Sequence, residues 1–271
     1  MTPRVARPQA LGRRRRLDGA GAGRSGVKLC MFSPRGQELE RGWPGRVDGD
    51  VIVQLAAQTL QAFFTGGGGA REHATYAVAD CVLRPPVLYP PAVRVFSPFD
   101  RAETPFFSFR SPHPVLGPDE TLRYPPGTDE LDYGLGIAVV IGLDGAIGGF
   151  TLANDWTARD LWSAERAAGF GPSKSSDFGL SLGPVVVTPD EEIGPALVAR
   201  VNGEERCGTD LRELVHTWAE LVAHAARGTE LRPGDILIAR APGRAAGPPL
   251  RRGDVVELQC DGIGVLGTRV A

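Results

Sequence analysis

Lysine is nearly absent from this sequence of 271 residues: only Lys28 and Lys174 are lysines among thirty basic residues, and all the others are arginines. Thirty-two acidic residues leave a formal charge of −2, so neither sign dominates. A surface that binds nucleic acid or an anionic membrane needs an excess of basic charge, so we expect neither kind of partner. No apolar run approaches the length of about eighteen residues that a membrane-spanning helix needs.

Cysteine is also sparse, and its spacing excludes the common metal and redox motifs. The four cysteines, Cys30, Cys81, Cys207 and Cys260, lie far apart and form no CxxC pair. Scattered thiols are typical of a reducing compartment, so we expect a cytoplasmic protein.

The chain divides by composition into three parts. Residues 1–26 are rich in Arg, Gly and Ala, and no apolar segment of a secretory signal follows them, so we predict a disordered tail. A nucleic-acid-binding arm is the alternative, and it rests only on the run Arg13–Arg16. Residues 27–91 are predicted to form a small α+β segment, and residues 92–271 a β-rich unit.

Local patterns predict the main elements, which together indicate an α+β, β-rich fold. Short apolar runs predict strands, and Asp261-Gly262 predicts a hairpin turn between two of them. A short helix is expected to end at the four glycines of 66–69. Apolar residues at helical spacing predict a longer helix over 210–227, with Thr209 as its N-cap and Gly228 as its stop. The expected strands are 51–55, 137–141, 182–188, 236–238 and 255–259.

Two polar stretches are candidates for chemistry. In the first, 151–160, an apolar strand ends at Asp155 and a helix is expected near Thr157, with Arg159 four residues after Asp155. This spacing places an anion and a cation together at the end of the strand. Alternatively, Asp155 or Thr157 caps the helix and Arg159 pairs with a surface acid. In the second, 171–184, Lys174 lies among serines and glycines, either to hold an anionic oxygen or as a solvated loop residue.

Taken together, these stretches resemble the fumarylacetoacetate hydrolase family. The resemblance covers roughly residues 92–271, and weakly extends to 43–49. It rests on 131–142, 154–160, Lys174-Ser175 leading to 182–184, 201–204, 231–237 and 251–254. The family implies a mixed-sheet β-roll or barrel-like core, usually in a homodimer. Its enzymes use Mg²⁺ or Ca²⁺ to cleave or rearrange 2-oxo or 1,3-dicarbonyl acids.

The sequence departs from the family pattern at the metal site. The resemblance implies two glutamates in a Glu-x-Glu pattern together with Asp155, but the glutamate positions are Gly134 and Gly136. Glycine has no side chain that could bind a metal, and one carboxylate alone holds Mg²⁺ poorly. We therefore expect no cofactor, with at most weak Mg²⁺ binding at Asp155.

Other family positions have also changed. The family's catalytic histidine belongs to the segment 94–109, which contains none, although Asp100 and Glu103 remain. Trp162 stands where the family often has Gln, Phe178 where it has Thr, and its Thr-Gly-Thr-Pro-like loop reads 239–242, Ala-Arg-Ala-Pro. Polar catalytic groups have thus been replaced, while the scaffold segments have stayed.

These observations favour a metal-independent enzyme for acid–base chemistry on a β-dicarbonyl or polyketide-like substrate, in secondary metabolism: dehydration, tautomerisation, cyclisation or decarboxylation. A non-catalytic relative that binds a ligand or partner, and a Mg²⁺-dependent C–C hydrolase of acylpyruvates, are the alternatives. The expected catalytic residues are Lys174, Arg159 and Asp155. The expected substrate-binding residues are Trp162, Phe178, Asp100, Tyr133 and Arg240.

Overall fold

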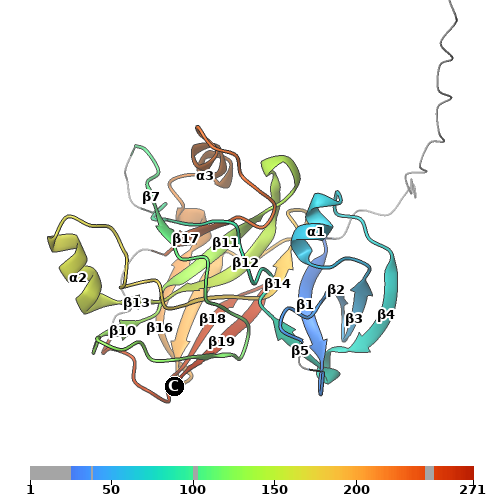
Figure 1. Cartoon of the computed structure of the whole chain (residues 1–271), viewed down its shortest axis with the longest axis horizontal. Coiled ribbons are helices and arrows are strands. Elements are labelled where there is room, and N and C mark those ends of the chain that lie inside the picture. The colour runs from blue at the N-terminus through green and yellow to red at the C-terminus, as the bar shows by residue number, and fades with distance from the viewer. Residues whose placement is uncertain (1–25, 38, 100–102, 242–246) are drawn as a thin grey trace, which may run out of the picture.

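The computed structural model describes residues 26–37, 39–99, 103–241 and 247–271. Three sheets of twelve, two and five strands form most of it, and the helices are few and short (Figure 1). The prediction of a β-rich α+β fold with mixed sheets is confirmed. Across these residues the strands do not close into a barrel, because the strand path of the largest sheet runs from β4 to β7.

The twelve strands of the largest sheet come from the N-terminal and central parts of the chain and from β17. They are β1 (Lys28–Pro34), β2 (Trp43–Asp48), β3 (Val51–Leu55), β4 (Glu72–Ala77), β5 (Cys81–Arg84), β6 (Val93–Phe96), β7 (Phe107–Arg110), β8 (Val115–Leu116), β11 (Leu135–Ile141), β12 (Ile147–Asp155), β14 (Leu180–Val187) and β17 (Ile236–Arg240). The five-stranded sheet contains β9 (Thr121–Leu122), β15 (Ala196–Val201), β16 (Glu204–Asp210), β18 (Val255–Cys260) and β19 (Gly264–Val270). The two-stranded sheet pairs β10 (Leu131–Asp132) with β13 (Thr157–Ala158).

The order of the largest sheet joins the N-terminal strands to the central ones. It runs β4-β3-β2-β1-β14-β12-β11-β17-β6-β7, with β5 paired to β1 and β8 paired to β14. The joint is antiparallel pairing of β1 with β14, Lys28 opposite Val187 and Leu29 opposite Val186. The division of the chain near residue 91 stays a prediction, and the main-chain ladder is continuous across it.

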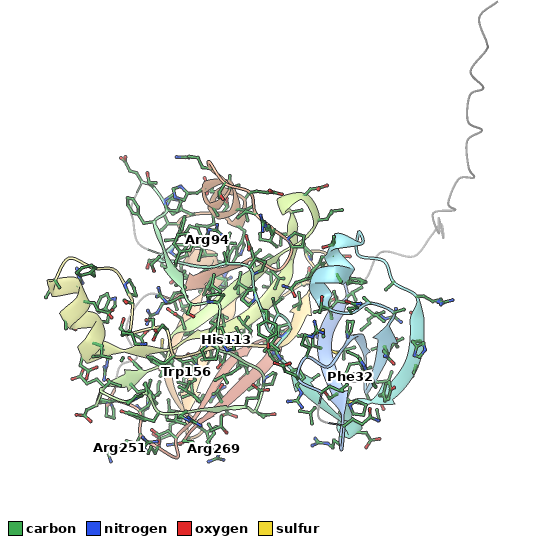
Figure 2. All side chains as sticks on the ribbon, viewed as in Figure 1. Phe32, Arg94, His113, Trp156, Arg251 and Arg269 are labelled. Carbon is green, nitrogen blue, oxygen red and sulfur yellow. The ribbon has the colours of Figure 1, made fainter. Side chains whose placement is uncertain are left out.

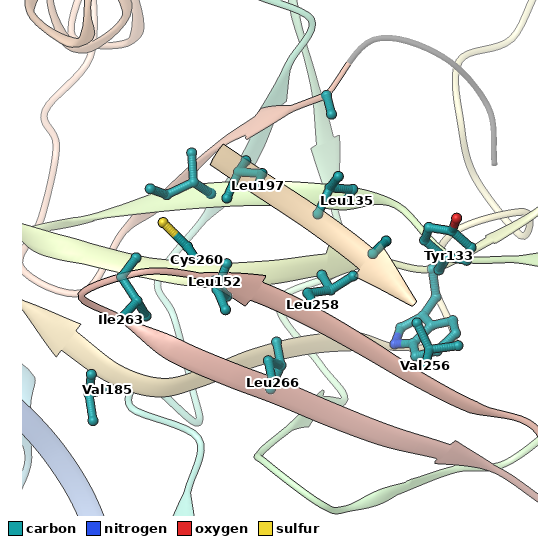
Figure 3. Close-up of a cluster of buried hydrophobic side chains, with 14 of the residues drawn as sticks. Tyr133, Leu135, Leu152, Val185, Leu197, Val256, Leu258, Cys260, Ile263 and Leu266 are labelled. Atoms are coloured by element: carbon teal, nitrogen blue, oxygen red, sulfur yellow. The ribbon is translucent and has the colours of Figure 1, made fainter. Parts of the chain in front are cut away.

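The core follows from the alternation of side chains along the central strands. On one face, Leu135 of β11 and Leu152 of β12 pack with Leu197 and Leu258 of the five-stranded sheet, and all four are almost fully buried. Figure 3 shows this cluster between the strands of the two sheets. On the other face, Ala138, Ile238 and other apolar residues pack in a second cluster with Leu60 and Phe64 of helix α1 (Leu60–Thr65). The face that carries this second cluster also leads to the strand ends described below.

The longer helix predicted over 210–227 is wrong in its first half. Residues Glu204–Asp210 form β16, which pairs with β15, and a 3₁₀ turn, η3 (Leu211–Glu213), follows. Helix α3 spans only Trp218–Ala225, and Thr217 rather than Thr209 is its N-cap, in a capping box with Glu220. Backbone hydrogen bonds to distant parts of the chain, from Leu211 to the carbonyl of Pro195 and from Val215 to that of Pro98, prevail over the helical spacing of the apolar residues.

The remaining helices are short. α1 begins at Leu60, capped by Thr59, and ends before Gly66, as the four glycines predict. α2 (Arg159–Ala167) follows β13, and the other 3₁₀ turns are η1 (Val78–Asp80) and η2 (Leu143–Gly145). In the described part of the chain, no helix has both the length and the apolar character needed to span a membrane.

Candidate functional site

Asp155 is a carboxylate buried at the end of a central strand. It is the last residue of β12, and its side chain is only 2% exposed. Around it lie the last residue of β7, Arg110, the last residue of β17, Arg240, and the glycine that precedes β11, Gly134. The sheet therefore brings together three charged strand ends from distant parts of the sequence. An isolated buried carboxylate would be strongly disfavoured, so its partners decide what the site can do.

Arg110 forms a bidentate ion pair with Asp155 through two nitrogens of its guanidinium group. Its Nε donates to Oδ1 of Asp155 at 2.7 Å, and its Nη2 donates to Oδ2 at 2.9 Å. Its Nη1 donates to the hydroxyl of Ser108 at 2.7 Å and to the carbonyl of Phe109 at 3.2 Å. The Arg110 side chain is 6% exposed, so this is a desolvated, bidentate ion pair.

Arg240 is a second cation on the same carboxylate, and it is held less tightly. Its Nη1 lies 3.4 Å from Oδ2 of Asp155, and its side chain is 26% exposed. Strand pairing sets Arg240 opposite Gly136 of β11. A Cβ built on Gly134 would lie 3.1 Å from Nε of Arg240 and 2.5 Å from the carbonyl oxygen of Asp155. A side chain at position 134 would therefore collide with the present backbone and with Arg240.

The backbone at this end of β12 is fixed by buried hydrogen bonds. The N–H of Asp155 donates to the carbonyl of Gly134 at 3.1 Å, and the N–H of Gly134 donates to the side-chain oxygen of Asn154 at 2.9 Å. The next residue, Trp156, is fully buried, and its Nε1 donates to the hydroxyl of Ser181 at 2.9 Å. Figure 2 shows Trp156 inside the molecule, between α2 and the C-terminal strands. These contacts hold the Asp155 carboxylate at a set position.

A second buried carboxyl, Asp132, lies on the neighbouring strand β10. The N–H of Tyr133 donates to its Oδ1 at 2.9 Å, and Nε of Arg159 lies 3.7 Å from its Oδ2. Burial raises the pKa of Asp132, although the positive charges of Arg159, Arg240 and Arg206 act in the opposite direction. Asp132 is thus a carboxyl group whose ionised form is disfavoured, surrounded by guanidinium groups.

Tyr133 supplies a buried hydroxyl beside this carboxyl. Its ring belongs to the core, and in Figure 3 the oxygen points away from the labelled aliphatic side chains. No described residue makes a hydrogen bond with this hydroxyl. Burial raises the pKa of Tyr133, so the hydroxyl keeps its proton and is a donor.

A divalent metal does not fit these residues. Both oxygens of Asp155 already face guanidinium groups, and Gly134 and Gly136 offer no ligand. A unit charge about 4 Å from another interacts by about 4 kcal/mol at an effective dielectric constant near 20, and a divalent ion doubles that repulsion from each arginine. Within the residues that the structure describes, no three His, Cys, Asp or Glu side chains lie together as a metal-binding group.

The structure brings only some of the predicted site residues together. Asp155 and Arg240 are in contact, and Tyr133 and Arg159 lie next to Asp132. Lys174 pairs with a residue outside this group: its side chain is 78% exposed, and its Nζ lies 2.7 Å from Oδ2 of Asp177. This matches the solvated-loop alternative, and a catalytic role for Lys174 stays a prediction.

The other predicted residues lie on α2, against the core, or outside the described part of the chain. Trp162 is half-buried on α2, with the Arg166 guanidinium 5.4 Å from its ring centre. Phe178 packs against the core cluster. Asp100 falls outside the described residues. Neither aromatic residue has a described contact with Asp155, so their roles as substrate contacts stay predictions.

The alternative that Asp155 or Thr157 caps α2 is wrong. The N-cap position is Ala158, which makes no side-chain cap, and the carboxylate of Asp160 instead accepts the N–H groups of Leu161 and Asp129. The expectation that Arg159 pairs with a surface acid is met only by Glu130, at 4.0 Å; the nearer acid, Asp132 at 3.7 Å, is buried.

Arg110, Asp132 and Arg206 are site residues that the sequence analysis missed. Arg110 ends a strand in which Phe107, Ser108 and Phe109 precede it, but it is one of many arginines and its partner is 45 residues away. The sequence places Asp132 only within the segment that resembles the family. Its position two residues before Gly134 was the available signal for it.

The comparisons with known proteins agree with this fold. The model of the fumarylacetoacetate (FAA) hydrolase C-terminal family matches residues 91–271. The chain belongs to this family. Similar solved structures include a fumarylacetoacetate hydrolase from the psychrophile Exiguobacterium antarcticum, with a TM-score of 0.76, 24% identity, and coverage of 90% of this chain and 99% of that one. Another is a 5-carboxymethyl-2-hydroxymuconate delta-isomerase from Mycobacterium smegmatis, with a TM-score of 0.72, 24% identity and the same coverage.

The curated relatives of this fumarylacetoacetate hydrolase family member include enzymes named as tautomerases. The oxaloacetate tautomerase YisK of Bacillus subtilis is 32% identical over 198 residues, which are 66% of this chain and 65% of that protein. The mitochondrial oxaloacetate tautomerase Fahd2a of Rattus norvegicus is 32% identical over 174 residues, which are 58% of this chain and 55% of that protein. The match thus spans little more than half to two thirds of these relatives.

Proposed function

We propose that this chain is a metal-independent enzyme that moves protons on a β-dicarbonyl or 2-oxo acid, and that its reaction is keto–enol tautomerisation. The observation that carries the proposal is the buried group Arg110–Asp155–Arg240, in which guanidinium groups surround the aspartate that the family pattern assigns to a metal. The names of the relatives, oxaloacetate tautomerases, support tautomerisation over the other proton-transfer reactions.

The chemistry of the reaction suits a site that holds positive charge. Removal of a proton next to a carbonyl leaves an enolate, in which negative charge collects on oxygen. Fixed cations or hydrogen-bond donors aimed at that oxygen lower the barrier, and they act most strongly where water is excluded. Guanidinium groups meet this need without a metal ion, and their planar donors match a carboxylate or enolate.

The proton itself needs a carboxyl that is not fixed in a bidentate pair. Asp155 is fixed in this way by Arg110, whereas the charged partner of Oδ2 of Asp132 among the described residues is the Nε of Arg159, at 3.7 Å. Burial of the Asp132 side chain raises its pKa, which favours a group that takes and returns protons. We therefore assign proton transfer to Asp132 within this proposal, instead of Asp155 or Asp100.

The test is tautomerisation of 2-oxo and β-dicarbonyl acids, oxaloacetate among them, followed by the ultraviolet absorbance of the enol. The proposal expects a rate that survives EDTA, falls in Asp132→Asn, and is unchanged in Arg46→Ala, a surface variant on β2. A rate that appears only with added Mg²⁺ would refute the proposal and show that the reaction depends on a metal ion. Thermal stabilisation by these acids without any turnover would make it a binding protein.

A further inference from the structure

Arg110 and Arg240 differ in how many of their donors are already used. Arg110 donates through Nε, Nη1 and Nη2 to Asp155, Ser108 and the carbonyl of Phe109, and it is almost fully buried. Arg240 lies 3.4 Å from one oxygen of Asp155, and none of the described residues accepts a hydrogen bond from it. A guanidinium carries five N–H groups. Arg240 therefore has donors left for a ligand, and Arg110 has few.

The position of Arg240 depends on the glycines that replaced the family's glutamates. Gly136 is the cross-strand neighbour of Arg240, and a Cβ there would lie 3.0 Å from Cγ2 of Ile238 and 3.1 Å from the carbonyl of Ala239. The Cβ of any other residue at 134 would lie 3.1 Å from Nε of Arg240. The guanidinium of Arg240 thus lies against the space that the Cβ of a larger residue at position 134 would occupy.

The surrounding charge favours an anion. Four guanidinium groups, those of Arg110, Arg159, Arg206 and Arg240, act on two buried carboxyl groups, Asp132 and Asp155. Glu130 is also near Arg159, but it is half exposed at the rim. Positive charge in excess of buried negative charge attracts an anionic ligand and repels a cation.

We propose that Arg240 is the residue that binds the carboxylate or enolate oxygens of the ligand, as a cation attached to the chain in place of a metal ion. The buried Arg110–Asp155 ion pair holds Asp155 in place, and Arg240 contacts Asp155. The ligand class is a small planar oxo acid or enolate, because a guanidinium fork pairs best with two oxygens in one plane. This inference rests on the proposed function, but its test needs no turnover.

The experiment is calorimetric titration of the full-length, EDTA-treated protein with oxalate, a planar dianion that mimics an enolised oxo acid. The unmodified chain is expected to bind oxalate without metal. Arg240→Gln is expected to weaken binding by about tenfold to a hundredfold, because one charge-assisted fork is lost. Arg240→Lys keeps the positive charge but not the two-pronged geometry, so its affinity for oxalate is expected to lie between those of the unmodified chain and Arg240→Gln. Arg46→Gln, on β2, is the matched control.

Each other result would overturn the assignment. Absence of oxalate binding to the unmodified chain, or equal affinity in Arg240→Gln, removes Arg240 as the ligand-binding cation. Binding in Arg240→Gln that Mg²⁺ restores would mean that a metal site persists. Circular dichroism of Arg240→Gln checks that the variant is folded, and a crystal grown with oxalate gives a second test, in which oxalate remote from Arg240 refutes the proposal.

The two proposals fail in different ways. Oxalate binding that depends on Arg240, combined with no tautomerisation, keeps this inference and removes the proposed function. Tautomerisation in EDTA that is intact in Arg240→Gln removes this inference and keeps the proposed function.

Discussion

Removal of the Arg110 side chain is expected to destabilise the protein strongly, because it leaves the Asp155 carboxylate without its bidentate partner. Asp155 is 2% exposed, so water cannot replace the two lost hydrogen bonds, and Arg240 at 3.4 Å is too loosely held to do so. Breaking a buried ion pair by truncating one partner costs about 3–5 kcal/mol. For a chain of this size, that corresponds to a fall in Tm of about 6 to 20 °C.

The assay is urea unfolding and thermal unfolding of Arg110→Ala beside two comparison variants. Arg46→Ala removes an exposed pair with Glu72, whose expected cost is about 0–1 kcal/mol. The double variant Arg110→Met with Asp155→Leu replaces the pair by apolar side chains of similar size. It is expected to recover most of the lost stability, because no unpaired charge stays buried.

Two results would refute this reasoning. A cost for Arg110→Ala as small as that for Arg46→Ala would mean that water reaches Asp155 in solution. A double variant that is as unstable as Arg110→Ala would mean that the unpaired Asp155 charge is not the cause of the loss.

Three further predictions concern metal, pH and helix capping. Neither Mg²⁺ nor EDTA is expected to change the Tm, whereas an ion bound at a hundred times its Kd would stabilise the fold by about 2.7 kcal/mol; a rise in Tm with Mg²⁺ would contradict the site geometry. Burial raises the pKa of Asp132 above its ordinary value of 3.8, so its ionised form disfavours the folded state above that raised pKa, and the effect vanishes as the pH falls towards 3.8. Asp132→Asn is therefore expected to be more stable than the unmodified chain at pH 7 and equal to it near pH 3.8, by thermal unfolding across this range; a deficit at pH 7 would refute the sign. Thr217→Ala removes the capping box of α3 and is expected to cost about 1 kcal/mol in urea unfolding, and no loss would mean that α3 is held by packing alone.

The parts of the fold that local sequence signals determine could be predicted. The apolar runs that became β11 and β14 have no competing pattern, and Asp261-Gly262 does form the turn between β18 and β19. The four glycines end α1 because none of them continues a helix well. In each case, the deciding residues are neighbours in the sequence.

The misassigned helix shows where local signals are insufficient. Leu211, Leu214 and Val215 have helical spacing with the residues of α3, but the N–H of Leu211 donates to the carbonyl of Pro195 and the N–H of Val215 to the carbonyl of Pro98. The helix therefore begins only after Thr217. The capping box of Thr217 and Glu220 was the better signal for the start of this helix. Tertiary pairing, which no window of sequence contains, decides this segment.

The candidate site was predictable in Asp155, Arg159 and Arg240, and not in Arg110. Asp155 stands at the end of a buried strand within a segment that resembles the family, and the glycines at 134 and 136 predicted that the metal ligands implied by the resemblance are missing. Nothing local marked Arg110 among so many arginines, since its role comes from a strand pairing across 45 residues. The bidentate contact of Arg110 with Asp155 could therefore be recognised only from the assembled sheet.

The pairing of β1 with β14 covers an edge of the central strands. All residues of β14 are buried, and it lies directly between β1 and the strand that carries Asp155. A shortened chain that began after β5 would leave the amides and carbonyls near Val186 and Val187 open along an apolar strand. Unpaired strand edges of this kind pair with strands from other molecules, so a chain trimmed to residues 91–271, which the family model matches, would aggregate.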